Sequence, residues 1–102
     1  MADNTLTILQ KCKNALRISL TTTMYDDEIQ DLIDAAERDI AETGILLGDA
    51  SDSLVRRAVV TYVKAHFGWN NSDAEKLEES YQRILRKMAS LTDYVEDDNA
   101  VE

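Results

Sequence analysis

The sequence predicts an all-α fold: a single small domain of four main helices in a bundle-like arrangement. Proline is absent and there are only three glycines, so long stretches contain no residue that obliges a helix to break. Apolar residues recur at helical spacing in four separate segments, and no segment shows the alternation that is typical of a strand. A chain of 102 residues can bury one core but not two.

The first helix is expected over residues 7–16. Thr7 with Gln10 fits a capping box at its start. Residues 19–23 are rich in β-branched and hydroxyl side chains of low helix propensity, so they are expected to form a connection. The apolar residues of the helix share one face: Ile8, Leu9, Cys12, Ala15 and Leu16.

The second helix is expected to begin at Asp26 or Asp27, whose carboxylates can accept hydrogen bonds from the first backbone N–H groups. It runs to about Thr43, and Gly44 supplies the left-handed residue that ends it. Residues 45–47 follow as a short apolar plug, and residues 48–52 as a surface loop. The side chains expected to face the core are Ile29, Leu32, Ile33, Ala36 and Ile40.

The third helix, residues 53–67, is the most apolar and is expected to be central. Gly68 is its predicted C-cap, and Trp69 is expected to fold back onto its last turn. Its apolar positions cover more than one face: Leu54, Val55, Ala58, Val59, Tyr62, Val63, His66 and Phe67.

The fourth helix is expected to start with a capping box of Ser72 and Glu75, after a turn at Asn70 and Asn71. Its apolar stripe comprises Leu77, Tyr81, Ile84, Leu85, Met88 and Leu91. The residues that follow are acidic and have no helical period. We therefore expect a helical domain of residues 1–92 and an acidic, flexible tail of residues 93–102.

Composition argues against several classes of protein. No apolar run approaches the roughly 20 residues that a membrane span needs, and the N-terminus lacks the pattern of a signal peptide, so a soluble, cytoplasmically made protein is expected. Cys12 is the only cysteine, which rules out an intramolecular disulfide, and it is expected to be buried. The formal net charge of −9 does not favour binding to free nucleic acid.

No pattern of catalytic, cofactor-binding or metal-binding residues stands out. His66 is the only histidine and shares a helix face with Tyr62 and Val59, which favours a place in the core or at its edge. The same expectation of packing applies to Met24, Met88 and four aromatic residues, Tyr62, Phe67, Trp69 and Tyr81. No EF-hand loop, histidine pair or phosphate-binding glycine motif is present. We therefore predict that this protein is not an enzyme, and that it has no cofactor or metal ion.

Charge is unevenly distributed along the chain. Residues 26–52 contain ten acids and a single base, Arg38. The bases lie elsewhere: Lys11, Lys13 and Arg17, and then Arg56, Arg57 and Lys64 in the acid-free third helix. One interpretation is a solvated face that keeps the protein soluble. The other is self-association, in which two different, complementary patches of one subunit meet and close a ring.

Several blocks of the sequence resemble the phage head-tail connector family, the adaptor proteins beneath the portal of long-tailed phages. The end of the first helix, Leu16-Arg17-Ile18, and residues 25–36 carry part of this similarity. The strongest block is residues 59–71, Val-Val-Thr-Tyr-Val-Lys-Ala-His-Phe-Gly-Trp-Asn-Asn, followed by residues 73–77 and Ser80-Tyr81. The similarity extends to about Tyr94, and none of these blocks is a catalytic signature.

The resemblance implies a structural virion protein that completes the head, as one subunit in a ring of about a dozen copies. Its implied partners are further copies of itself, the portal protein and the next tail-ward connector protein, with DNA only as transiting cargo. The implied location is the head-tail interface of the virion, after synthesis in the bacterial host cytoplasm. Related proteins grip the portal with extended or C-terminal segments, which here would place Tyr94 and Val95 at the portal.

Two roles for the charged residues fit this resemblance, and the sequence does not choose between them. The acidic face of the second helix would either line the channel and repel DNA phosphate, or meet the bases of a neighbouring subunit. The candidate residues are Glu28, Asp31, Glu37 and Glu42 on the acidic side and Arg56, Arg57 and Lys64 on the basic side.

A second class of function also stays open. A small acidic helical protein could act as a regulator, or as an inhibitor that mimics DNA through its acidic face. Such a protein would be a monomer or dimer and would bind a basic partner with steep salt dependence.

Overall fold

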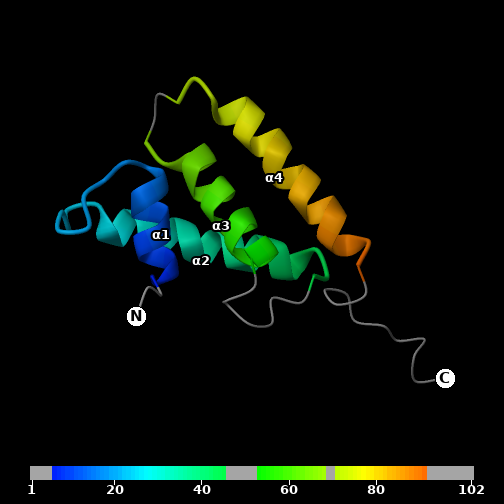
Figure 1. The fold of residues 1–102 in the computed structure, drawn as a ribbon. Helices are drawn as coiled ribbons and strands as arrows, with labels where there is room; N and C mark the ends of the chain where they lie inside the picture. Colours follow the sequence, from blue (N-terminus) through cyan, green and yellow to red (C-terminus); the bar gives the residue numbers. More distant parts are fainter. Residues whose placement is uncertain (1–5, 46–52, 69–70, 92–102) are drawn as a thin grey trace.

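The computed structural model describes residues 6–45, 53–68 and 71–91, and the structural statements below concern these residues. They form four helices, α1 (Ile8–Ala15), α2 (Asp26–Glu42), α3 (Ser53–His66) and α4 (Ala74–Ala89) (Figure 1). The predicted all-α class is confirmed. The predicted helix bounds agree with the structure to within one or two residues, apart from the fourth helix, for which only the start and the stripe were predicted.

Helix α1 begins as predicted, with a reciprocal capping box. The backbone N–H of Gln10 donates to Thr7 Oγ1 at 3.1 Å, and the backbone N–H of Thr7 donates to Gln10 Oε1 at 3.0 Å. The helix ends at Ala15 with Leu16 as its C-cap, and the next residue, Arg17, has a left-handed φ of 65° although it is not glycine. The N–H of Ile18 then donates to Lys13 O at 2.8 Å, which satisfies a carbonyl of the last turn.

The start of α2 differs from the prediction. Its N-cap is Tyr25, and no side chain caps the helix, so the capping role expected of Asp26 or Asp27 is wrong. Both carboxylates lie in the first helical turn instead, where the helix dipole favours negative charge. The helix ends as expected before Gly44, whose φ is 90°.

The expected capping box of Ser72 and Glu75 is also wrong. The N-cap of α4 is Asp73, which makes no side-chain capping bond. Asn71 organises the turn instead: its Oδ1 accepts from the N–H of Asp73 at 3.0 Å, and its Nδ2 donates to Lys64 O at 2.6 Å. One amide side chain thus ties the end of α3 to the start of α4, while Gly68 adopts the predicted left-handed conformation with a φ of 77°.

Helix α3 is central, as predicted, because it contacts α1, α2 and α4 (Figure 1). Each of the core side chains along α2 is at most 1% exposed, and burial of such side chains contributes roughly 1.5–3 kcal/mol apiece for isoleucine. The buried apolar residues are Cys12, Ile29, Ile33, Ala36, Ile40, Ile45, Val55, Ala58, Val59, Val63, Ala65, Tyr81, Ile84, Leu85 and Met88.

Two expected packing residues are exposed. Met24 is 76% exposed and Leu91 is 39% exposed, so the packing predicted for them is wrong. Met24 precedes α2 in the connection, and Leu91 follows the last residue of α4, so neither faces the core. Trp69, residues 46–52 and the tail residues Tyr94 and Val95 lie outside the described residues. No helix in the described part of the chain is long and apolar enough to cross a membrane.

Candidate subunit interface

The acidic side of the molecule is the outer surface of α2. The helix turns its apolar stripe to the core and leaves five carboxylates exposed on the other sides: Asp27, Glu28, Asp31, Asp34 and Glu42. Glu42 accepts from Arg38 Nε at 3.1 Å, but both side chains are more than half exposed, so this pair contributes little to stability. The surface is therefore open to a partner and strongly negative.

Three of the four acidic candidates lie on one side of α2, spread along the helix, and we call this side the acidic patch. At roughly 100° per residue, Glu28, Asp31 and Glu42 lie on one side of α2, whereas Glu37 lies on the opposite flank of the buried stripe. Glu37 is also partly buried, and burial, followed by the charge of Asp34, raises its pKa above the usual range of a glutamate. Glu37 is thus not part of the same patch.

The three basic candidates also lie together. Arg56, Arg57 and Lys64 line a shallow groove of about 310 Å³ on the outer side of α3. Its remaining lining is neutral: Ala15 of α1 and Ser53, Val60 and Thr61 of α3. Because α3 contains no acid, nothing in this helix offsets the positive charge. We call this surface the basic groove.

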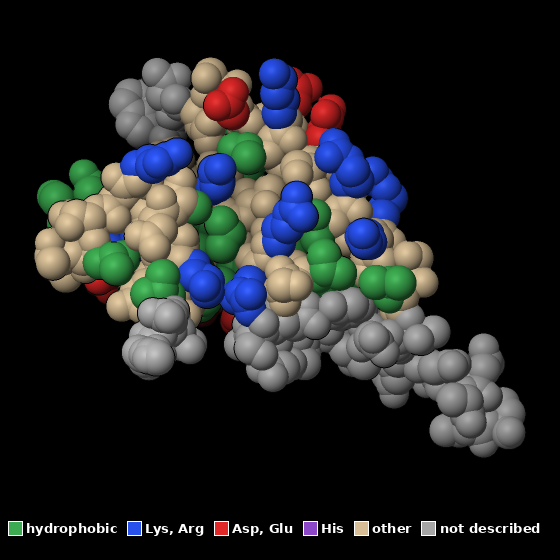
Figure 2. All heavy atoms as spheres, in the orientation of Figure 1, with side chains coloured by type: hydrophobic (Ala, Val, Ile, Leu, Met, Phe, Trp, Pro, Cys, Tyr) green, Lys and Arg blue, Asp and Glu red, His purple; other side chains and the backbone are tan. Residues whose placement is uncertain are grey.

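Further bases lie on α4, outside the basic groove, and the sequence analysis missed them. Arg83, Arg86 and Lys87 are all exposed on the second half of α4. Figure 2 shows Lys and Arg side chains spread over the face formed by α1, α3 and α4, with apolar side chains between them. The sequence does carry a signal for these bases: residues 81–89 contain all three of them and no carboxylate.

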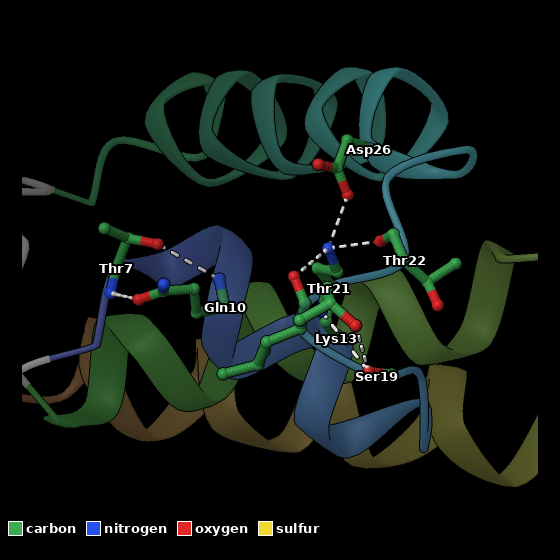
Figure 3. A network of polar contacts seen from close by, with 8 residues as sticks. Thr7, Gln10, Lys13, Ser19, Thr21, Thr22 and Asp26 are labelled. Carbon is green, nitrogen blue, oxygen red and sulfur yellow. Dashed lines mark hydrogen bonds and ion pairs between the residues drawn. The ribbon is translucent and has the colours of Figure 1, made fainter.

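Lys13, one of the bases that precede the acidic second helix, does not lie at the surface. Its side chain is only 3% exposed, and its ammonium group points into the connection between α1 and α2 (Figure 3). Nζ donates to Leu20 O at 3.2 Å and to Thr22 O at 2.5 Å, and it pairs with Asp26 Oδ1 at 2.8 Å. A buried ammonium needs such a complete set of partners, so this contact fixes the shape of the connection.

A second groove of about 680 Å³ lies between α3 and α4 and includes the histidine. The ring of His66 stacks on that of Tyr62 with centroids 4.2 Å apart, and its Nε2 lies 3.3 Å from Glu78 Oε1. The His66 and Glu78 side chains are both 43% exposed, so the histidine lies at the edge of the core. The hydroxyl of the buried Tyr81 donates to Asp39 Oδ2, at the edge of this groove, at 2.6 Å and joins α4 to α2.

The described residues offer little to a catalytic or metal site. Cys12 is fully buried, as predicted, and burial raises the pKa of its thiol to about 12, which keeps it protonated and unreactive at neutral pH. No group of three or more His, Cys, Asp or Glu side chains in the described part of the chain could hold a metal ion.

Comparison with known families decides what kind of protein carries these surfaces. A family model described as phage connector protein matches residues 8–95, from the first residue of α1 to beyond the end of α4. The chain belongs to the phage connector protein family. No curated protein and no solved structure matched it.

Membership in the phage connector family confirms the resemblance found in the sequence. The role of this connector protein is structural: it is a component of the virion that contacts other virion proteins. The family therefore favours the connector prediction over a regulator or a DNA mimic. It also gives a reason for exposed patches of opposite charge, because a connector must bind its neighbours in the particle.

Proposed function

We propose that this connector protein is the adaptor subunit of a head-tail ring, which joins the portal to the next tail-ward protein and leaves a passage for DNA. The single observation that supports this proposal is the separation of charge within one small domain. Carboxylates cover the exposed side of α2, and the basic groove runs along α3. Two different complementary patches on one subunit are what a head-to-tail contact requires, and such contacts close into a ring when the rotation between neighbouring subunits permits.

Reversing charge in the basic groove tests the ring. The substitutions Arg56→Glu and Arg57→Glu together should abolish assembly, because like charges would then face each other across the interface. Arg57 is exposed whereas Arg56 is partly buried, so the single variant Arg57→Glu separates loss of assembly from loss of stability. Native mass spectrometry with and without purified portal would measure the assembly.

A charge-matched control is available on α4. Reversal of the exposed Arg83 and Arg86 changes the net charge by the same amount but leaves the groove intact. This control should still assemble. Unchanged assembly of the groove variant would remove the α3 interface from the proposal, and equal loss in both variants would point to net charge rather than to a specific contact.

The acidic patch allows a second test, which separates an interface from a channel lining. The triple variant Glu28→Gln, Asp31→Asn and Glu42→Gln removes the charge with little change of shape. If this patch meets the basic groove of a neighbour, the variant should assemble poorly and lose salt dependence. If the patch lines the channel, rings should form normally, and DNA passage should slow because fewer carboxylates repel the phosphates.

The C-terminal segment has a separate role in this proposal. We expect residues 1–92 to form the domain and residues 93–102 to bind the portal, with Tyr94 and Val95 as the contacting side chains. Deletion of residues 93–102 should then leave the melting temperature unchanged while reducing co-sedimentation with portal. Full portal binding by the truncated chain would refute this role.

A further inference from the structure

We propose that the end of the connection between α1 and α2 inserts into the basic groove of a second copy of this chain. The inserting surface consists of Leu20, Met24 and Tyr25, and we call it the apolar tip. This inference rests on the proposed function, because it names the contact through which the ring would assemble. It adds an apolar centre to an interface that charge alone would leave weak.

The apolar tip is unusual in its exposure. Met24 is 76% exposed, Leu20 40% and Tyr25 38%, and together they are three of the four large hydrophobic side chains exposed in the described part of the chain. The fourth, Leu91, lies just beyond the C-terminal end of α4. Figure 2 shows hydrophobic side chains at the left end of the molecule, where Figure 1 places the connection between α1 and α2. Exposed apolar side chains concentrated in one short connection are what an inserting contact requires.

The tip is also held in a fixed shape. The buried ammonium of Lys13 binds two carbonyl oxygens within the tip segment, those of Leu20 and Thr22, and the carboxylate of Asp26 directly after it (Figure 3). At the end of the connection, the ring of Tyr25 packs edge-on against Phe67 with centroids 5.8 Å apart. A surface that is already ordered loses less conformational entropy when it binds, so these contacts suit a docking element.

Charge identifies the occupant of the groove. Asp27 and Glu28, both exposed, directly follow the tip in the first turn of α2 and give it a negative border. The basic groove has the opposite pattern, in which Ala15 and Val60 provide apolar lining and Arg57 and Lys64 provide positive charge. Its volume of about 310 Å³ suits a few inserted side chains rather than a whole helix.

The contact must be head-to-tail. A symmetric contact of tip with tip would place Asp27 and Glu28 of the two copies near each other, which like-charge repulsion disfavours. Tip and groove are different surfaces of one chain, so each subunit offers one to each neighbour, and the contact repeats around a ring. The portal or the tail-ward protein would be the alternative occupant of the groove, and the experiments below separate these outcomes.

The first experiment places a charge in the tip. We expect Leu20→Glu and Met24→Glu each to weaken self-association at least roughly tenfold, because the glutamate would have to leave water at the centre of the contact. The melting temperature should change little, since both side chains are exposed. Leu91→Glu is the matched control, because Leu91 is 39% exposed and Leu20 is 40% exposed. Sedimentation velocity with and without purified portal would report the association.

The second experiment tests the pairing directly by cross-linking. Chains with Met24→Cys are mixed with chains with Thr61→Cys, which lies in the groove, and are oxidised under assembly conditions. A disulfide between the two variants is expected, with Met24→Cys and Leu91→Cys as the unlinked control pair. The native Cys12 does not compete, because it is 0% exposed.

The outcomes separate the inference from the function on which it rests. If the tip variants form rings as readily as the wild type, and the specific cross-link does not appear, the tip contact is overturned and the ring proposal stands. Tip variants that form rings but no longer bind portal or tail protein would assign the tip to that partner and overturn self-insertion. A wild-type chain that forms no rings, even with portal, would overturn both.

Discussion

Removal of the buried charge of Lys13 should strongly destabilise the protein. The substitution Lys13→Met keeps the length and the apolar stem of the side chain but removes the ammonium. It leaves the carboxylate of Asp26 and the carbonyl oxygens of Leu20 and Thr22 without their shared donor. Breaking one partner of a buried ion pair costs about 3–5 kcal/mol when the other partner stays fully buried.

The expected cost for Lys13→Met is somewhat lower. The side chain of Asp26 is 29% exposed, so water can partly solvate its carboxylate after the ammonium is gone. The two carbonyl oxygens face the same connection and can also regain some water. We therefore expect a loss of about 2–4 kcal/mol in the free energy of unfolding, which lowers the melting temperature of a domain of this size by roughly 10–25 °C.

Chemical and thermal unfolding, followed by circular dichroism, would measure this loss. Lys11→Met, on the same helix, is the control and should change stability by less than about 0.5 kcal/mol. In a double-mutant cycle, Asp26→Asn should cost much less in the Lys13→Met background than in the wild type. A loss below about 1 kcal/mol for Lys13→Met would refute the idea that this ammonium holds the connection together.

Three further predictions follow from single residues. Arg17→Gly should raise the free energy of unfolding by about 0.5–1 kcal/mol, because glycine adopts a φ of 65° without strain. A lower free energy of unfolding for the variant, measured in urea, would contradict this. Tyr81→Phe should cost about 1–2 kcal/mol through loss of the hydrogen bond to Asp39. Burial and this hydrogen bond raise the pKa of Tyr81, so wild-type stability should hold below pH 10 and fall as the pH rises further, whereas the variant should show a weaker fall in alkaline melting curves. Glu37→Gln should stabilise the protein slightly at pH 7, because burial and Asp34 raise the pKa of Glu37 and so disfavour its charged form; the gain should vanish near pH 3, and a gain that grows on acidification would be inconsistent.

Much of the fold could be predicted because it depends on local rules. The capping box of Thr7 and Gln10, and the left-handed glycines Gly44 and Gly68, are signals that act within a few residues. The apolar stripe of α2 follows from helical spacing alone. The charge patches were also foreseeable, since Arg57 and Lys64 share a helix face by their spacing.

Most errors, apart from the cap of α2, concern contacts that no local pattern reveals. Lys13 is buried because its ammonium reaches carbonyl oxygens seven and nine residues later, in a connection whose path the sequence does not specify. The bond between Tyr81 and Asp39 spans 42 residues and depends on how α4 packs near α2. Asn71 displaced the predicted capping box of α4 because its amide can reach the last carbonyls of α3. The apolar tip was not predicted, because Met24 was expected to pack and its exposure depends on the path of the same connection.

The central position of α3 has a consequence for how this protein can evolve. Only Ser53, Arg57 and His66 of its fourteen residues are exposed, since the helix is covered by α1, α2 and α4. Most substitutions in α3 must therefore suit several neighbours at once, which slows their acceptance. The outer side of α2 has no such packing restriction, so substitutions there are limited by what this surface binds and not by the core. Lineages of this connector should alter α3 only together with compensating changes in the helices around it.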